Sequence, residues 1–169
     1  MVRKTILLLA AGMVSIGILS IGVLAMRPLN FSEDMTGKKA PAFTLKDTQG
    51  KVTDTAEYLG KQPVVIFFWT TWCPHCRRQI SHLEKESAKI SQAGAALILV
   101  DIEEDAIDVV RFLKGINSPL DSLLDEDSEV AGKYAVVGVP TFVVIGADGV
   151  IKFHGNSLPN EYQKFLAEK

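Results

Sequence analysis

The sequence has only two cysteines and three histidines among its 169 residues. Structural zinc sites usually take four Cys or His ligands, so the lack of a second cysteine pair argues against zinc. Haem attachment needs a histidine directly after a Cys-x-x-Cys pair, and Arg77 stands there instead. No cysteine lies near the end of the N-terminal apolar segment, which excludes a lipid-modified N-terminus.

Basic residues are not in excess, since 18 Lys and Arg stand against 20 Asp and Glu. Without a basic stripe, we expect no nucleic acid partner. Two acidic runs, residues 103–105 and 125–127, are expected to be solvated loops and helix starts, where the helix dipole favours negative charge. Docking to a basic partner is the alternative interpretation of these runs.

The chain begins with two basic residues, and residues 5–26 then carry no charge. A helix of about 20 apolar residues spans a bilayer, so we expect residues 1–26 to be a membrane anchor. The alternative is a cleaved signal peptide, for which Val23-Leu24-Ala25 would serve as the cleavage site. Residues 27–35 are interpreted as a tether and residues 36–169 as one soluble domain.

We place that domain outside the cytoplasm, as a single-pass protein of the cell membrane. The start of the chain resembles a signal-anchor, and long domains translocate largely regardless of their charge. Two cysteines at a redox spacing, with no others, also suit an exported protein that must avoid stray disulfide pairing.

The rest of the chain predicts alternating strands and helices, and so an α/β fold. A strand, a helix and a second strand in succession imply a parallel pair with a crossover. The helix expected at 105–114 is amphipathic, and its residues available for burial are Ile107, Val110, Phe112 and Leu113. The closing helix expected at 158–168 is amphipathic as well. The expected elements are a hairpin at 43–45 and 51–53, a short turn or helix at 55–59, strands at 64–69, 95–101 and 123–124, helices at 77–92, 105–114, 128–134 (capped by Ser128 or Asp127) and 158–168, and a hairpin at 142–145 and 150–154.

The two cysteines lie where the strand at 64–69 turns into the helix at 77–92. The unpaired N–H groups and the positive dipole at an exposed helix start stabilise a thiolate on Cys73. Cys76, one turn further on, can then resolve a mixed disulfide formed at Cys73. Pro74 fits the first helical turn, and Trp72 would shield the dithiol. A purely structural disulfide is the less favoured alternative, because so small a loop restricts the unfolded chain little.

The segment Trp72-Cys73-Pro74-His75-Cys76, after an apolar strand, resembles the thioredoxin superfamily. Far downstream, Gly138-Val139-Pro140-Thr141 resembles the cis-proline loop that faces the dithiol in that superfamily. The stretch at 37–50 is similar to the extracytoplasmic TlpA/ResA-type branch, and the resemblance extends over about residues 36–168. It implies a thioredoxin-like fold: a central mixed β-sheet flanked by helices, with an N-terminal β-hairpin, here preceded by the expected transmembrane helix.

The resemblance implies a thiol-disulfide oxidoreductase with Cys73 and Cys76 as catalytic residues and no cofactor beyond their disulfide. Its partners would be exported proteins with disulfides or dithiols, and a membrane electron donor. Cytochrome c maturation is one role that the family implies. The backbone of Val139 would pair with the substrate as an added strand. The residues expected to shape the site are Trp72, Pro74, His75, Gln79, Val139 and Pro140.

The sequence departs from these relatives at two acidic positions. Thioredoxins carry a buried aspartate where Phe67 stands, and the ResA-type branch carries a glutamate where Gln79 stands. The Pro74-His75 pair resembles DsbA-type oxidases, in which a histidine would stabilise the thiolate and make the disulfide more oxidising. On overall similarity to the TlpA/ResA-type branch we nevertheless expect a reductase, with a DsbA-like oxidase as the alternative.

Two further alternatives remain open. A thiol peroxidase would suit Thr70, three residues before Cys73, but Ile66 stands where such enzymes carry a proline. A metal or haem delivery module would use Cys73, Cys76 and His75 as ligands.

Overall fold

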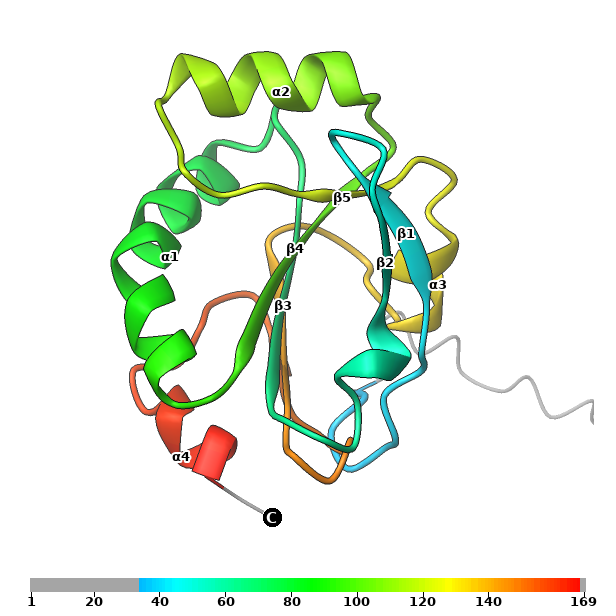
Figure 1. Cartoon of the computed structure of the whole chain (residues 1–169), viewed down its shortest axis with the longest axis vertical. Coiled ribbons are helices and arrows are strands. Elements are labelled where there is room, and N and C mark those ends of the chain that lie inside the picture. The colour runs from blue at the N-terminus through cyan, green and yellow to red at the C-terminus, as the bar shows by residue number, and fades with distance from the viewer. Residues whose placement is uncertain (1–33, 168–169) are drawn as a thin grey trace, which may run out of the picture.

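The computed structural model describes residues 34–167 of the chain. Figure 1 shows a central sheet with helices packed around it. Within the described range, no helix has the length and apolar character needed to cross a bilayer. The predicted anchor at 1–26 and most of the tether at 27–35 lie outside the described residues.

A seven-stranded mixed sheet forms the centre of the domain, in the order β2-β1-β5-β4-β3-β6-β7. The predicted N-terminal hairpin is present, and it joins the main sheet because β1 pairs antiparallel with β5. Strand β3 pairs parallel with β4, as expected from the strand-helix-strand pattern, and antiparallel with β6. The strands are β1 (Thr44–Asp47), β2 (Val52–Asp54), β3 (Val64–Trp69), β4 (Ala96–Ile102), β5 (Leu123–Asp125), β6 (Thr141–Ile145) and β7 (Ile151–Gly155).

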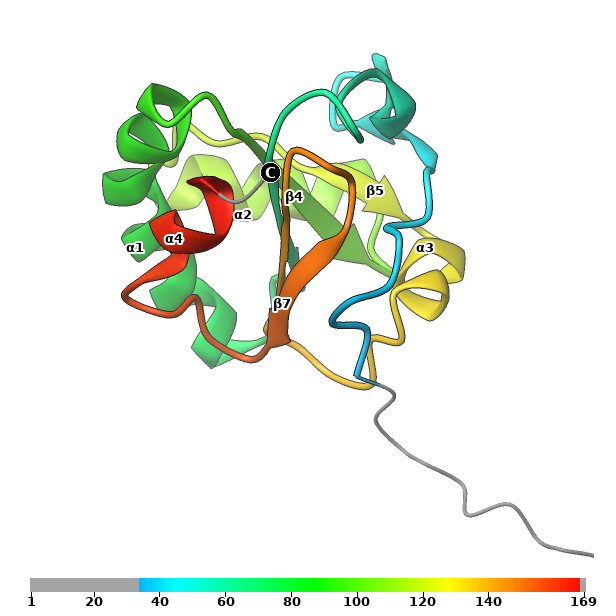
Figure 2. The same ribbon diagram turned by 90° about the horizontal axis from the view of Figure 1, so that it is seen from below.

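Helices cover both faces of this sheet, so β3 is apolar at every position rather than alternating. Figure 2 shows α1, α2 and α4 on one side of the sheet and α3 on the other. Phe67 and Trp69 point into the core under α1, whereas Ile66 and Phe68 point into the core under α3. The helices are α1 (Pro74–Gln92), α2 (Ala106–Gly115), α3 (Glu129–Lys133) and α4 (Tyr162–Ala167), with a 3₁₀ turn η1 (Thr55–Glu57).

The predicted cap of α3 is only partly right. Ser128 occupies the N-cap position with a left-handed φ of 59° and makes no capping hydrogen bond, whereas Asp127 accepts one from the Glu129 N–H at 3.1 Å. The buried carboxylate of Asp125 accepts hydrogen bonds from the N–H groups of Val130 and Ala131, at 3.0 and 2.7 Å. The predicted solvation of the acidic run at 125–127 is therefore wrong for Asp125, which ends a strand and reaches α3 only through the fold.

The predicted burial of Ile107 in α2 is wrong, since its side chain is 66% exposed. Asp105 caps the helix by accepting a hydrogen bond from the Asp108 N–H, and the face that this start turns inward carries Val109 and Leu113. The last helix is also shorter than expected: α4 begins at Tyr162 rather than near residue 158.

Candidate dithiol active site

Cys73 occupies the N-cap position of α1, at the junction with β3 that the sequence predicts. Its Sγ accepts a hydrogen bond from the backbone N–H of Cys76 at 3.2 Å. Pro74 is in the first turn, where no backbone donor is needed. A sulfur in this position receives a helix N–H and lies at the positive end of the dipole, which stabilises negative charge on it.

Both cysteines are free and more enclosed than an exposed helix start would suggest. Cys73 is 5% exposed, and Cys76 is fully buried behind it. Burial, together with the neighbouring Cys73 thiol, raises the pKa of the Cys76 thiol to about 12. The two sulfurs therefore differ strongly in environment, with Cys73 at the surface edge and Cys76 in the core.

The loop at Gly138–Thr141 faces the dithiol, as the resemblance implies. The Val139–Pro140 peptide bond is cis, which confirms the prediction, and the Val139 carbonyl oxygen lies 3.7 Å from Cys73 Sγ. The loop is held by Thr141, whose hydroxyl donates to the Gly138 carbonyl, and by Asn156, whose side-chain amide donates to the Pro140 carbonyl. The fold thus brings together two motifs that lie far apart in the sequence.

The rim of the site combines one exposed aromatic ring with three basic side chains. Trp72 is 67% exposed, more than a residue that only shields the dithiol would be. His75 Nδ1 lies 2.7 Å from a guanidinium nitrogen of Arg78. Because arginine can only donate, Nδ1 of His75 is the acceptor in this contact. Arg77 donates to the Thr71 carbonyl and lies over the Phe112 ring.

Neither of the two acidic positions of the relatives is occupied by a group that can titrate. Phe67 is fully buried and packs against Phe142, with ring centroids 4.6 Å apart. Gln79 is half-buried on α1, one turn after Cys76.

Sequence reasoning missed two carboxyl groups near this end of the sheet, Asp101 and Glu104. Asp101 is fully buried in β4, and Glu104 accepts hydrogen bonds from both the N–H and the hydroxyl of Thr71. The available signal was a charged residue at the end of the apolar run at residues 95–100, where the pattern predicts core.

A hollow of about 380 Å³ opens beside the dithiol, between the Trp72 side and the proline loop. Its lining is mostly apolar, with Glu103 as a charged member, and it comprises Thr70, Trp72, Ile102, Glu103, Ser128, Ala131, Gly132 and Val136 to Val139. A groove of this kind next to a reactive sulfur can hold an extended segment of another protein.

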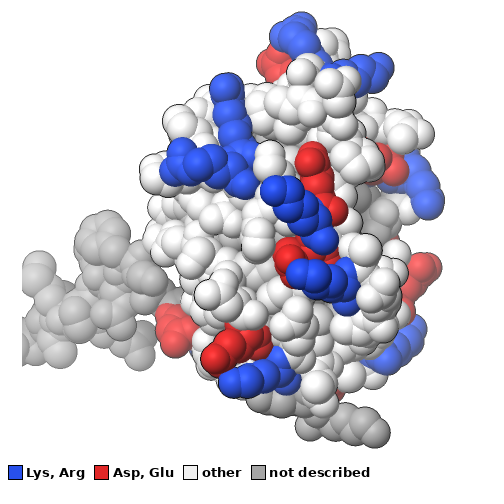
Figure 3. Space-filling model, turned by 90° about the vertical axis from the view of Figure 1, so that its left-hand side faces the viewer, with Lys and Arg blue, Asp and Glu red and all other residues white. Residues whose placement is uncertain are grey.

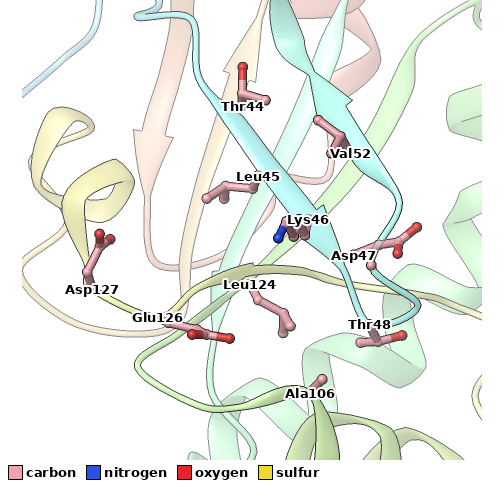
Figure 4. A pocket seen from close by; sticks show the side chains of 11 residues that line it. Thr44, Leu45, Lys46, Asp47, Thr48, Val52, Ala106, Leu124, Glu126 and Asp127 are labelled. Carbon is pink, nitrogen blue, oxygen red and sulfur yellow. The ribbon is translucent and has the colours of Figure 1, made fainter.

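A larger hollow, of about 500 Å³, lies away from the dithiol, between the hairpin β1–β2, strand β5 and the start of α2. Figure 4 shows the side chains that line it, with Leu45, Lys46 and Leu124 on strands and Glu126 and Asp127 beyond β5. It contains no cysteine or histidine. Across residues 34–167, no group of three potential metal-ligating side chains comes together.

The face that bears α1 carries mixed charge. Figure 3 shows Lys and Arg side chains interspersed with Asp and Glu over this face. Some of these charges are paired along one helix, as in the contact of 2.7 Å between Lys89 and Glu86.

Comparisons with known proteins agree with this geometry. The model of the AhpC/TSA family matches residues 36–154. The chain is similar to the thiol-disulfide oxidoreductase ResA of Bacillus thuringiensis, at 28% identity over 77% of this chain and 76% of the relative. It is 30% identical to ResA of Halalkalibacterium halodurans, over 74% and 71% of the two chains.

Among solved structures, the chain resembles a secreted Mycobacterium tuberculosis disulfide oxidoreductase that is homologous to E. coli DsbE. The identity is 27%, the TM-score is 0.63, and the match covers 74% of this chain and 94% of that one. The fold agrees with that of this solved structure. The chain therefore belongs to the AhpC/TSA family, and it is a thioredoxin-like thiol-disulfide oxidoreductase.

Proposed function

We propose that this protein is a membrane-anchored, extracytoplasmic reductase that exchanges disulfides in exported proteins through Cys73 and Cys76. The observation that carries the proposal is the geometry of the dithiol. Cys73 Sγ accepts the Cys76 N–H at the start of α1, and Cys76 lies buried behind it. This arrangement gives one sulfur for attack and a second sulfur for resolution.

The reaction proceeds in two exchanges. The Cys73 thiolate attacks one sulfur of the substrate disulfide, and the other substrate sulfur leaves and takes up a proton. Cys76 then loses its proton and attacks Cys73 Sγ, which forms the Cys73–Cys76 disulfide and releases the second substrate sulfur as a thiol. The two electrons given to the substrate are restored by a reductant in the membrane. No cofactor besides the cysteine pair takes part.

The groove beside Cys73 supports a protein substrate rather than a small molecule. Val139 is half-buried and precedes the cis Pro140, and its backbone would pair with an extended substrate segment as an added strand. Trp72, at the opposite wall of the groove, offers a flat apolar surface to that segment.

The reducing direction rests on the overall similarity of the chain to the ResA-type relatives. The DsbA-like Pro74-His75 pair is the feature that favours the oxidase alternative. A role in cytochrome c maturation would fit a reductase of this kind, with an apocytochrome thiol pair as the product.

The reduction potential tests the direction. We expect the full chain in detergent, equilibrated with glutathione buffers, to show a potential near that of thioredoxin, about −270 mV. A value near that of DsbA, about −120 mV, would make the protein an oxidase instead. Peroxide consumption, measured alongside, would identify the thiol peroxidase alternative.

Location and substrate need separate experiments in the native host. Alkaline extraction of membranes tests anchoring by residues 1–26, and protease access to intact protoplasts tests the side on which the domain lies. A soluble mature form that begins near Met26 would instead show a cleaved signal peptide. Cys76→Ser should trap the substrate as a mixed disulfide with Cys73, since the resolving thiol is absent.

A further inference from the structure

Asp101 lies on the dithiol side of the sheet, near the end of β4. The parallel registers place it beside Trp69 of β3 and Leu124 of β5. Paired residues on neighbouring strands point to the same face, and both partners belong to the core that also contains Cys73 and Cys76. The Asp101 carboxyl group is therefore on the α1 face, at the end of the sheet where the dithiol lies.

This carboxyl group is fully buried, and neither of its oxygens makes a hydrogen bond of good geometry, although the side chain and the backbone N–H of Glu104 lie close to it. Buried polar groups in native proteins are nearly always paired, so an unpaired carboxyl group at this place calls for an explanation. It contrasts with Asp125 at the end of the neighbouring strand, which is also buried but accepts two hydrogen bonds from α3.

Glu104 is the acidic neighbour of Asp101, two residues after the end of β4. Its two carboxylate oxygens accept hydrogen bonds from the N–H and the hydroxyl of Thr71, both at 2.5 Å. Thr71 precedes Trp72 and Cys73, and the Cys73 N–H donates to the carbonyl of Thr70 at 3.4 Å. These two hydrogen bonds of Glu104 therefore hold the short loop that precedes Cys73 at the start of α1.

The protonation of Asp101 decides whether Glu104 can keep this position. Burial, followed by the proximity of Glu104, raises the pKa of Asp101 to about 9, so the group is a neutral acid at neutral pH. The paired positions on the neighbouring strands are Trp69 and Leu124, neither of which titrates. The Cys73 and Cys76 thiols of α1 belong to the same core, and Glu104 is the charged group that shifts the pKa of Asp101.

We propose that Asp101 is a positioning residue for the dithiol, whose proton allows Glu104 to hold Thr71 and so to fix the loop before Cys73. When Asp101 ionises, two adjacent carboxylates repel each other in a desolvated site. Glu104 then leaves Thr71, and Cys73 loses its fixed place at the helix start. This inference rests on the proposed role of Cys73 as the attacking thiol.

The rate of alkylation of Cys73 between pH 6 and pH 11 tests this inference, using the full chain in detergent with Cys76→Ser as background. A thiol alone gives a rate that rises to a plateau as the thiolate forms. We expect the background protein to rise above that curve above pH 9, by at least about threefold at pH 10.5, because Cys73 is only 5% exposed and release of the loop as Asp101 ionises uncovers its sulfur.

Two variants should restore the simple curve. Asp101→Asn cannot ionise, and Glu104→Gln keeps an oxygen for Thr71 while removing the repulsion. The matched control is Asp125→Asn, which neutralises a buried carboxyl group on the next strand and should retain the rise above pH 9. If Asp101→Asn fails to fold, Glu104→Gln alone decides.

Superimposable curves for the background protein and both variants would overturn the inference, and so would a rise that Asp125→Asn also removes. Failure of the proposed function has a different signature. In the protein with both cysteines, peptide mapping would then find the alkyl group mainly on Cys76. If the alkylation rate instead rises to a plateau as for an isolated thiol, and the alkyl group is found on Cys73, only the role of Asp101 is refuted.

Discussion

The unequal reactivity of the two cysteines is the sharpest consequence of the site geometry. We consider two single-cysteine variants of the full chain, Cys76→Ser, which leaves Cys73, and Cys73→Ser, which leaves Cys76. Each variant retains a small hydroxyl group at the replaced position, so the packing of the start of α1 changes little. The remaining thiol then reports its own environment.

The expected magnitude follows from the burial of Cys76. Its pKa rises from 9.0 to about 12, with burial as the largest cause, and burial persists when Cys73 is replaced. At pH 7 the thiolate fraction then falls from about 10⁻² to about 10⁻⁵, because each pKa unit is a factor of ten. The part of the shift that comes from Cys73 itself is lost in the variant. We therefore expect Cys76 to react about 10² to 10³ times more slowly than an ordinary exposed cysteine.

The assay is the rate of iodoacetamide labelling at pH 7, followed by mass spectrometry, with circular dichroism to show that each variant is folded. The Cys73 thiol should label readily, because its sulfur accepts the helix N–H and contacts the carbonyl of Val139, a residue that lines the groove. An unfolded sample in denaturant supplies the rate of an unprotected cysteine. Equal rates for Cys73 and Cys76 in the folded variants would refute the assignment of attacking and resolving thiols.

Three further predictions concern stability and substrate contact. Tyr162→Phe should lower the free energy of unfolding by about 1.5–3 kcal/mol in urea titrations, since it removes a buried hydrogen bond of 2.9 Å to the Glu86 carboxylate; a loss below 0.5 kcal/mol would show that this link between α4 and α1 contributes little. The folded-state pKa of Asp101 is raised to about 9, so its stabilising contribution is complete below about pH 4 and is lost as the pH rises towards 9. Wild-type stability should therefore decline relative to Asp101→Asn across that range, by at most about 1.4 kcal/mol per pH unit, and parallel curves would contradict this. Trp72→Ala should leave stability within about 0.5 kcal/mol, because the ring is 67% exposed, but should slow reduction of a protein disulfide about 2- to 10-fold while sparing a small aromatic disulfide.

The sequence alone determined the architecture around the dithiol. The apolar run at 64–69, followed by Trp72 and the cysteine pair, predicts a buried strand leading into a helix, and the structure has β3 and α1 there. Local signals were sufficient because strand pattern, proline position and helix periodicity all act over a few residues. The facing loop at Pro140 was predicted from its resemblance to a known motif, and the structure places it against Cys73.

Only the tertiary structure decided which polar groups the fold buries and which partners they find. Asp125 was expected to be solvated, but it is buried and accepts hydrogen bonds from the start of α3. Asp101 ends the predicted buried strand, and only the fold shows that its carboxyl group lies next to Glu104. The same holds for Cys73, which the sequence places at an exposed helix start and the structure encloses. Sequence patterns determine local structure, because strand alternation, helix periodicity and proline position act between residues that are close along the chain. Burial and pKa depend instead on groups that folding brings together from distant segments, and no local pattern records them.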